Sequence, residues 1–249
     1  DLHSFPTRRS SDLGNFDLGY DFVTDMLVLE FFLDDEKINV NRKNNLWVGR
    51  AAQSLAEALR LAVSKELDIE FTELVAGYRL RTSGDRSFVD IYLYDNLSSG
   101  AGYAVGITDK LTELLDSAAY ILGNCSCDGA CYSCLKHYRN QYIHGFLNRF
   151  AALDLLRWGR QGVLALSLTV EEQMRCLTPI LPILTRMHRR VEITPDGIEI
   201  HNETSEKTTN LVIYPAMWVC PVLEGKIFVS DAYLACARPY AVDWILKHT

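Results

Sequence analysis

Four cysteines within ten residues constrain this chain more than any other feature of its sequence. They are spaced C-x-C-x3-C-x2-C, at Cys125, Cys127, Cys131 and Cys134. Thiolates at this spacing can reach one tetrahedral ion with metal–sulfur bonds of roughly 2.3 Å. Gly129, between the two pairs, can take a positive φ and lets the loop turn back. Four thiols among small and polar residues make no sense as packing, so the run predicts a metal site.

Zinc is the metal that this ligand set favours, because an all-sulfur tetrahedron suits a redox-inert d10 ion. With four protein ligands no position stays open for an activated water, so we expect a structural zinc. An iron–sulfur cluster remains an alternative, although such clusters usually take one ligand from farther along the chain. Zinc would add about 10 kcal/mol of apparent binding free energy to a loop with little core of its own.

Composition excludes several classes of protein. The 249 residues carry a formal net charge of −7, so any nucleic-acid contact must be local rather than spread over the surface. No apolar run approaches the roughly 18 residues of a membrane helix, and none is expected to span a membrane. Seven cysteines is an odd count, and Cys176, Cys220 and Cys236 are expected to be small buried side chains. A cytoplasmic protein is therefore expected, not a secreted disulfide framework.

The chain is expected to divide into three parts. Residues 1–14 have no hydrophobic period and resemble translated sequencing-adaptor sequence, so we interpret them as a non-native or disordered leader and expect the native chain to extend upstream. Residues 15–160 form the predicted zinc-binding domain. Residues 161–249 form a C-terminal α/β unit of unassigned role, because Gly159 and Gly162 mark a break in the pattern.

Hydrophobic periodicity predicts an α+β fold: a small antiparallel sheet with long helices and a four-cysteine zinc loop, followed by a smaller α/β C-terminal unit. In the first part we expect a strand at 21–33, a helix at 46–67 and a hairpin of strands at 72–81 and 88–94. Two further helices are expected at 103–122 and 146–158, the last with Asn148 as its N-cap. In the C-terminal unit we expect a helix at 169–187 that prolines break, and a final helix at 241–247. Four short strands are expected between them, at 190–194, 198–202, 210–214 and 226–230.

The order of these motifs resembles a known family. A loop Ser99-Gly100-Ala101-Gly102-Tyr103 and a helix precede the cysteines, and His137-Tyr138-Arg139-Asn140 and a helix starting after Asn148 follow them. Over about residues 20–158 this resembles the MrfA-type zinc-binding domain, which lies C-terminal to the motor domains of DEAD/DEAH-box (superfamily 2) DNA helicases, including those of DISARM-like anti-phage systems. One departure is Ser99, where a second glycine is expected.

The resemblance implies that the four cysteines bind zinc and that the domain supports DNA binding or strand separation, in DNA repair or phage defence. It implies DNA, single-stranded or forked, and helicase motor domains in the same polypeptide as partners. The motor itself is not encoded here, because the sequence has neither a G-x4-G-K-[ST] loop nor a D-E-x-[DH] motif. We expect no catalytic site in this chain. The glycine loop could hold a phosphate on its N–H groups, but tight entry into the helix is its expected role.

Basic and aromatic residues follow the cysteines and reverse the acidic balance of the chain locally. Lys136, Tyr138, Arg139 and Arg149 are the predicted DNA contacts, because basic residues interleaved with aromatics suit backbone contact and base stacking. The alternative is a solvated helix face whose arginines pair with neighbouring acids. His137 and His144 are expected to be hydrogen-bonded rather than metal ligands, since four cysteines complete a tetrahedron.

Two other functions remain open. The chain could be a zinc-stabilised protein-interaction module that docks a partner subunit of a defence complex. It could also be a nuclease, because Asp196 and Glu224-Gly225-Lys226 match the PD…(D/E)-x-K pattern formally. Both acids are predicted to lie in hairpin turns, whereas nuclease ligands lie within strands.

Overall fold

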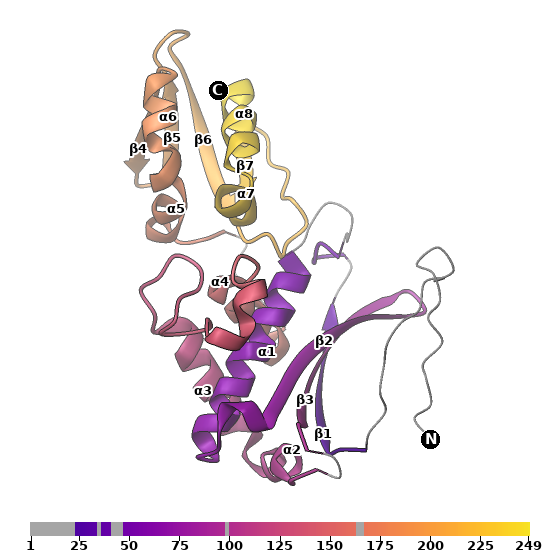
Figure 1. Ribbon diagram of the computed structural model, residues 1–249. Helices are drawn as coiled ribbons and strands as arrows, with labels where there is room; N and C mark the ends of the chain where they lie inside the picture. The colour runs from indigo at the N-terminus through magenta and orange to yellow at the C-terminus, as the bar shows by residue number, and fades with distance from the viewer. Residues whose placement is uncertain (1–22, 34–35, 41–46, 98–99, 163–166) are drawn as a thin grey trace, which may run out of the picture.

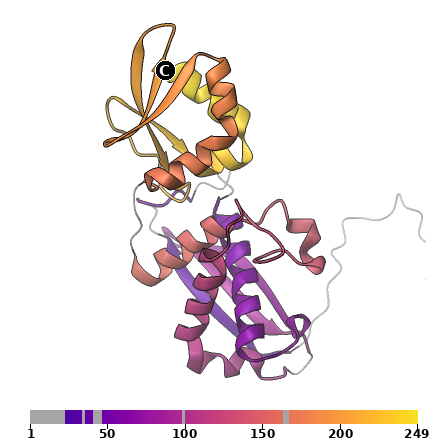
Figure 2. The ribbon, with the colours of Figure 1, turned by 90° about the vertical axis from the view of Figure 1, so that its left-hand side faces the viewer.

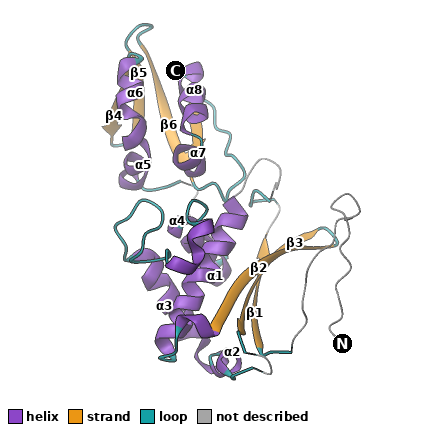
Figure 3. Cartoon of the chain, viewed as in Figure 1, coloured by secondary structure: helices purple, strands orange, loops and turns teal. Residues whose placement is uncertain are grey.

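The computed structural model describes residues 23–33, 36–40, 47–97, 100–162 and 167–249. A three-stranded sheet with its helices forms the N-terminal part, and a four-stranded sheet with its helices forms the C-terminal part (Figures 1 and 3). The predicted α+β class is confirmed. The leader predicted at 1–14 lies outside the described residues, as does Ser99.

The first sheet is antiparallel throughout, in the order β1-β3-β2. Its strands are β1 (Met26–Leu33), β2 (Leu74–Ser83) and β3 (Arg86–Asp95). The predicted hairpin is present, because β2 pairs with β3 from Leu74 opposite Asp95 to Ser83 opposite Arg86. The turn between them contains Gly84 at a φ of +60°, a conformation that side chains rarely adopt.

Helix α1 (Trp47–Glu66) lies along this sheet and supplies much of the first core. Ala51, Ala52, Leu55, Ala58, Leu59 and Ala62 are fully buried and follow the predicted helical period; Ser54 and Ala56 are fully buried as well. Helices α3 (Leu111–Gly123) and α4 (Arg149–Gln161) pack against α1. Removing these apolar faces from water is the main stabilisation of this part.

One long helix was predicted over 103–122, and the structure has two. Helix α2 (Tyr103–Gly106) is a single turn, Thr108–Lys110 form a 3₁₀ turn, and α3 starts at Leu111. Lys110 leaves the helical region with φ −115° and ψ 29°, and Gly106 lowers the helical preference of the turn before it. The apolar spacing continues across 103–122 without a gap, so it could not predict the break at Thr108–Lys110.

The C-terminal part begins with α5 (Val170–Leu177) and α6 (Leu181–Arg186), which the predicted proline break separates at Thr178–Ile180. Four strands follow: β4 (Arg189–Thr194), β5 (Gly197–Asn202), β6 (Lys207–Tyr214) and β7 (Lys226–Ser230). They are ordered β4-β5-β6-β7, with only the β6–β7 pair parallel. The chain ends in α7 (Asp231–Cys236), which was not predicted, and α8 (Arg238–His248).

The two parts have separate apolar cores but touch through the segment after β6. Trp218 lies edge-on to Trp158 of α4, with ring centroids 5.9 Å apart, and Asn39 N donates to Met217 O at 2.8 Å. Figure 2 shows the C-terminal part above the first. The domain limits at 15–160 and 161–249 stay a prediction. Within the described residues, no helix is long and apolar enough to cross a bilayer.

Candidate metal centre

The four predicted ligand sulfurs converge on one point. The Sγ atoms of Cys125, Cys127, Cys131 and Cys134 all lie within 4.8 Å of one another. Three of the separations are 3.5 Å (Cys125–Cys131), 3.7 Å (Cys127–Cys134) and 3.8 Å (Cys131–Cys134). Four sulfurs at roughly 2.3 Å from one zinc form a tetrahedron with edges of ~3.8 Å. The donor atoms and their spacing therefore fit zinc.

Backbone N–H groups point at two of these sulfurs. Ser133 N donates to Cys131 Sγ and Cys131 N donates to Cys134 Sγ, both at 3.3 Å. The Ser133 N–H lowers the pKa of Cys131 to about 6, whereas burial raises the pKa of Cys134 to about 12. Zinc takes thiolates and releases their protons, so a bound ion would stabilise the anionic form of the buried Cys134 as well.

Arg149 supports the cysteine loop from within the protein. It is only 5% exposed, and its Nε and Nη1 donate to Cys127 O and Leu122 O, each at 2.9 Å. Its backbone N donates to Gly129 O at 2.7 Å. The sequence predicted an exposed DNA contact here, but the guanidinium is buried against these carbonyls. It instead joins the start of α4 to the loop that holds the sulfurs.

A buried network anchors the segment after the cysteines to α1. His137 Nε2 lies 3.0 Å from Glu57 Oε2 and 3.2 Å from Arg60 Nη2, while His144 Nε2 lies 2.9 Å from Asn140 Oδ1. Burial lowers the pKa of His137 although the Glu57 carboxylate opposes the shift. Neither histidine joins the sulfur cluster, as predicted. Sequence reasoning missed Glu57 and Arg60, which lie almost eighty positions away and resemble ordinary helix-surface residues.

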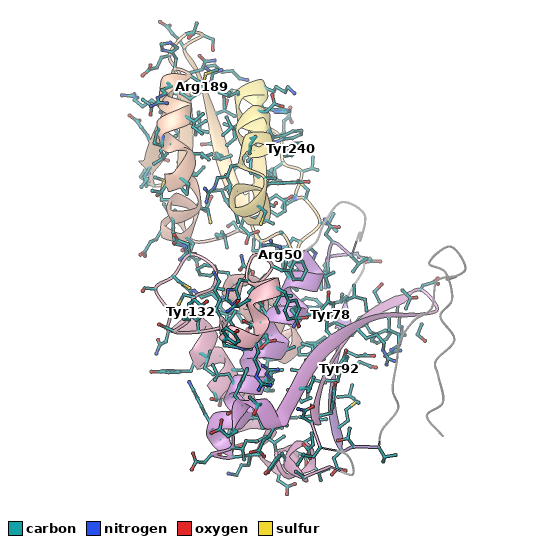
Figure 4. The ribbon with its side chains drawn as sticks, in the orientation of Figure 1. Arg50, Tyr78, Tyr92, Tyr132, Arg189 and Tyr240 are labelled. Atoms are coloured by element: carbon teal, nitrogen blue, oxygen red, sulfur yellow. The ribbon has the colours of Figure 1, made fainter. Side chains whose placement is uncertain are left out.

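The other predicted DNA contacts lie on the surface beside this network. Tyr138 is 82% exposed and Arg139 is exposed, whereas Lys136 is partly buried. Two more tyrosines accompany them, Tyr132 at 70% exposure in the cysteine loop and Tyr142 at 86% (Figure 4 labels Tyr132). No ion pair involves Lys136 or Arg139 within the described part of the chain. The structure therefore brings three of the four predicted contacts together and separates Arg149 from them.

The glycine loop before α2 binds a carboxylate of its own chain. Asp95 is fully buried and accepts from the N–H groups of Ala101, Tyr103 and Ala104 at 2.6, 3.1 and 3.0 Å. Gly100 has a φ of +74°, and a side chain there would collide with Asp25. Because Asp95 uses these donors, the loop forms the tight helix entry that was predicted, and the phosphate alternative fails.

The two acids of the nuclease-like pattern lie at opposite ends of the second sheet. Asp196 is in the β4–β5 turn, next to Gly197, while Glu224 precedes β7. Strand β6 is the common reference. Asn210 of β6 pairs with Lys226, so Glu224 falls beside Thr208. Leu211 of β6 pairs with Ile198, so Asp196 falls beyond Val212. At about 3.3 Å per residue this offset exceeds ~13 Å, too far for one metal ion. Within the described residues, no metal-ligand cluster contains either acid.

The three single cysteines are less buried than the sequence suggested. Cys176 is partly buried, but Cys220 and Cys236 are exposed. The prediction of three small buried side chains is therefore wrong for these two. Cys220 lies in the loop between β6 and β7, and Cys236 ends α7, where the chain turns toward α8.

Residues 55–135 match the family described as the MrfA Zn-binding domain, a range that includes all four cysteines. The chain is 34% identical over 190 residues to the Druantia protein DruE of Escherichia coli (strain UMEA 4076-1). The alignment covers 73% of this chain and 10% of DruE. The crystal structure of the DUF1998 helicase MrfA bound to DNA overlaps 47% of this chain and 15% of its own, at 17% identity and a TM-score of 0.37.

The chain thus spans about a tenth of the length of DruE. The family match begins at Leu55, within α1, and covers the rest of that helix, the hairpin, the glycine loop, α3 and the cysteine cluster; it ends before Tyr138 and Arg149. The convergence of the four sulfurs agrees with the zinc in the family's description. Residues 55–135 are therefore an MrfA Zn-binding domain.

Proposed function

We propose that this chain is the zinc-binding accessory region of a larger, cytoplasmic, ATP-dependent DNA helicase that acts in DNA repair or phage defence. The family is named for MrfA, itself a helicase whose crystal structure holds DNA. The chain matches a tenth of DruE, which leaves ample length for motor domains in the same polypeptide. In this proposal Cys125, Cys127, Cys131 and Cys134 hold a structural zinc and no chemistry occurs at the metal.

The observation that carries the DNA contact is the exposed aromatic and basic surface that follows the cysteines, formed by Lys136, Tyr138, Arg139 and Tyr142 and here named the tyrosine surface. Tyr138 and Tyr142 expose 82% and 86% of their area, so their rings are open to a ligand. Bases of single-stranded DNA stack on such rings, and lysine and arginine contact the phosphates. Single-stranded or forked DNA is thus the proposed ligand.

A bound zinc would help to hold the tyrosine surface in place. Cys134 and Leu135 are buried, and Asn140 Nδ2 donates to Leu135 O at 2.9 Å. The cysteine loop thereby fixes one end of the tyrosine surface while His137 ties it to Glu57 of α1. A rigid platform loses less conformational entropy when it binds a flexible strand.

The test is binding of fluorescently labelled dT15 to the zinc-loaded chain, followed by anisotropy at several salt concentrations. We expect weak binding whose logarithm falls with log salt by about 0.7 per contacted phosphate. Tyr138→Ala with Tyr142→Ala should weaken it by at least about fivefold, since each stacked base contributes about 1–3 kcal/mol. Tyr240→Ala, an exposed ring of the C-terminal part (Figure 4), is the matched control. Absent or salt-independent binding, or equal loss in the control, rejects the proposal.

A second candidate is a protein-interaction module, as the sequence also allowed. It is favoured by one face of β1, where Met26, Val28 and Phe32 are 52%, 49% and 48% exposed, with the charged Glu30 between Val28 and Phe32. Exposed apolar residues on one face often mark a protein contact. If Met26→Ser with Val28→Ser abolishes co-purification with the upstream part of the polypeptide or a partner subunit, while dT15 is never retained, this candidate replaces the first.

A further inference from the structure

A large cavity lies where the first part of the molecule meets the C-terminal part. Its volume is about 830 Å³, within the range of roughly 300–1,000 Å³ that small-molecule sites occupy. The cysteine loop contributes Asp128 and Gly129, α4 contributes one wall, and α5, α7 and the start of α8 form the other. Arg50, at this junction in Figure 4, belongs to α1.

Five arginines line this cavity: Arg50, Arg149, Arg157, Arg175 and Arg238. None of them forms an ion pair with a carboxylate within the part of the chain that the structure describes. Arg50 and Arg149 donate to backbone carbonyls and are partly or fully buried. Arg157, Arg175 and Arg238 come from three different helices and are exposed, although Arg238 Nε donates to Leu234 O at 3.1 Å and Arg175 stacks over the Phe150 ring at 4.1 Å. Three exposed guanidinium groups therefore lie beside the cavity.

The acids of the cavity do not neutralise these arginines. Asp231 Oδ1 accepts from Ala216 N at 2.8 Å and Ala232 N at 2.7 Å, and Glu172 accepts from Thr169 N at 3.0 Å. Burial, reinforced by the charge of Asp231, raises the pKa of Asp154 to about 8, so this carboxyl is mostly protonated at neutral pH. Five arginines then face three ionised carboxylates, with Asp128 as the third. The lining carries an excess of positive charge in a chain whose net charge is negative.

We infer that this cavity is a binding site for a phosphate-bearing anion. Guanidinium groups bind phosphate through paired N–H donors, and arginines from separate helices can surround one phosphate. The neutral carboxyl of Asp154 has a proton to donate to the same ligand. A free nucleotide or pyrophosphate and the backbone of DNA share this chemistry. The site does not depend on DNA binding by the tyrosine surface, which lies on a different segment.

The test compares two variants of the zinc-loaded chain that lose the same charge. Arg157→Gln, Arg175→Gln and Arg238→Gln remove the accessible guanidinium groups of the cavity. Arg86→Gln, Arg186→Gln and Arg190→Gln remove three exposed arginines that do not line it. Calorimetric titrations use sodium pyrophosphate in one arm and dT15 in the other. We expect at least a tenfold loss of affinity in the cavity variant and less than a twofold change in the control.

The two arms identify the source of the phosphate. If the cavity variant loses affinity for both probes, a phosphate group outside a DNA chain is sufficient for binding. If it loses affinity for dT15 alone, the site takes a DNA backbone. If the two variants bind both probes equally well, or the native chain binds neither, the proposal is overturned. Phenylglyoxal modification gives a readout without substitutions, because the bound probe should protect Arg157, Arg175 and Arg238 but not Arg186. Equal modification with and without the probe would also overturn it.

Discussion

The C-terminal part encloses an apolar core between its sheet and helices, with Leu177, Ile200, Ile213 and Ile245 fully buried, whereas the cysteine loop has almost no apolar side chains to bury. Between Gly123 and Leu147 only Cys134, Leu135 and Asn140 are buried, along with Leu147 itself. The C-terminal part is stabilised by removing apolar surface from water. The cysteine loop depends on four sulfurs, one arginine and a histidine–glutamate contact.

This difference explains why the exposed rings lie where they do. A metal-stabilised loop can leave Tyr132 and the tyrosine surface open and still be ordered, because its order does not depend on burying those rings. The loop can therefore present a binding surface that a hydrophobic core would consume. Four changes test this difference between the two regions.

Zinc removal should have the largest effect. Chelation takes away up to about 10 kcal/mol of apparent binding free energy from the cysteine loop and nothing from the C-terminal core. We expect hydrogen exchange of peptides from 124–149 to rise by orders of magnitude, while peptides from β5 and β6 stay protected. Cys131→Ser should mimic chelation, and the exposed Cys236→Ser is the control. Equal loosening of both regions would show that they are a single cooperative unit.

Replacing Arg149 should come next. Arg149→Ala leaves Cys127 O and Leu122 O without their donors in a buried place, at a cost of about 3 kcal/mol in the free energy of unfolding. Arg139→Ala, on the exposed side of the same region, should change stability by less than about 0.5 kcal/mol. Urea unfolding measures both. If the two variants are equally stable, Arg149 does not hold the loop.

Asp154 gives a pH-dependent effect at the junction of the two regions. Its pKa is raised to about 8 from 3.8, mainly by burial, then by Asp231 and Glu172 against the opposing charge of Arg157; Arg50 also lines its pocket. The folded state thus holds the proton more tightly than the unfolded chain. This contribution to the free energy of unfolding is greatest below pH 4, falls as the pH rises toward 8, and is level above it.

Asp154→Asn removes that dependence. We expect the variant to gain about 2 kcal/mol over the native chain at pH 8, a figure reduced from about 1.4 kcal/mol per pKa unit because the cavity admits water. Near pH 4 the two should be equally stable. Asp85→Asn, in the exposed hairpin turn, should show no such difference. Thermal unfolding across this pH range provides the measurement, and parallel curves for native chain and Asp154→Asn would contradict it.

The sequence predicted features that depend on neighbours along the chain. The four-cysteine cluster, the 74–95 hairpin, the proline break after α5 and the Asn148 cap all rest on spacings of a few residues. It failed where distance along the chain mattered. Arg149 looked like a surface cation, because nothing nearby reveals that Leu122 O, 27 positions earlier, is its acceptor. The arginines of the cavity come from helices up to 188 residues apart and share no pattern.

The smallest effects come from two helix caps of similar chemistry. Asn148 Oδ1 accepts from Phe150 N and Ala151 N at 3.0 Å, and Thr169 Oγ1 accepts from Glu172 N at 3.3 Å. Replacing either with alanine should lower the free energy of unfolding by about 1 kcal/mol. Only Asn148→Ala should also speed the loss of zinc to a competing chelator, because it frees the start of α4 that positions Arg149. If Thr169→Ala speeds it equally, the metal responds to overall stability, and the two regions are less independent than their separate cores imply.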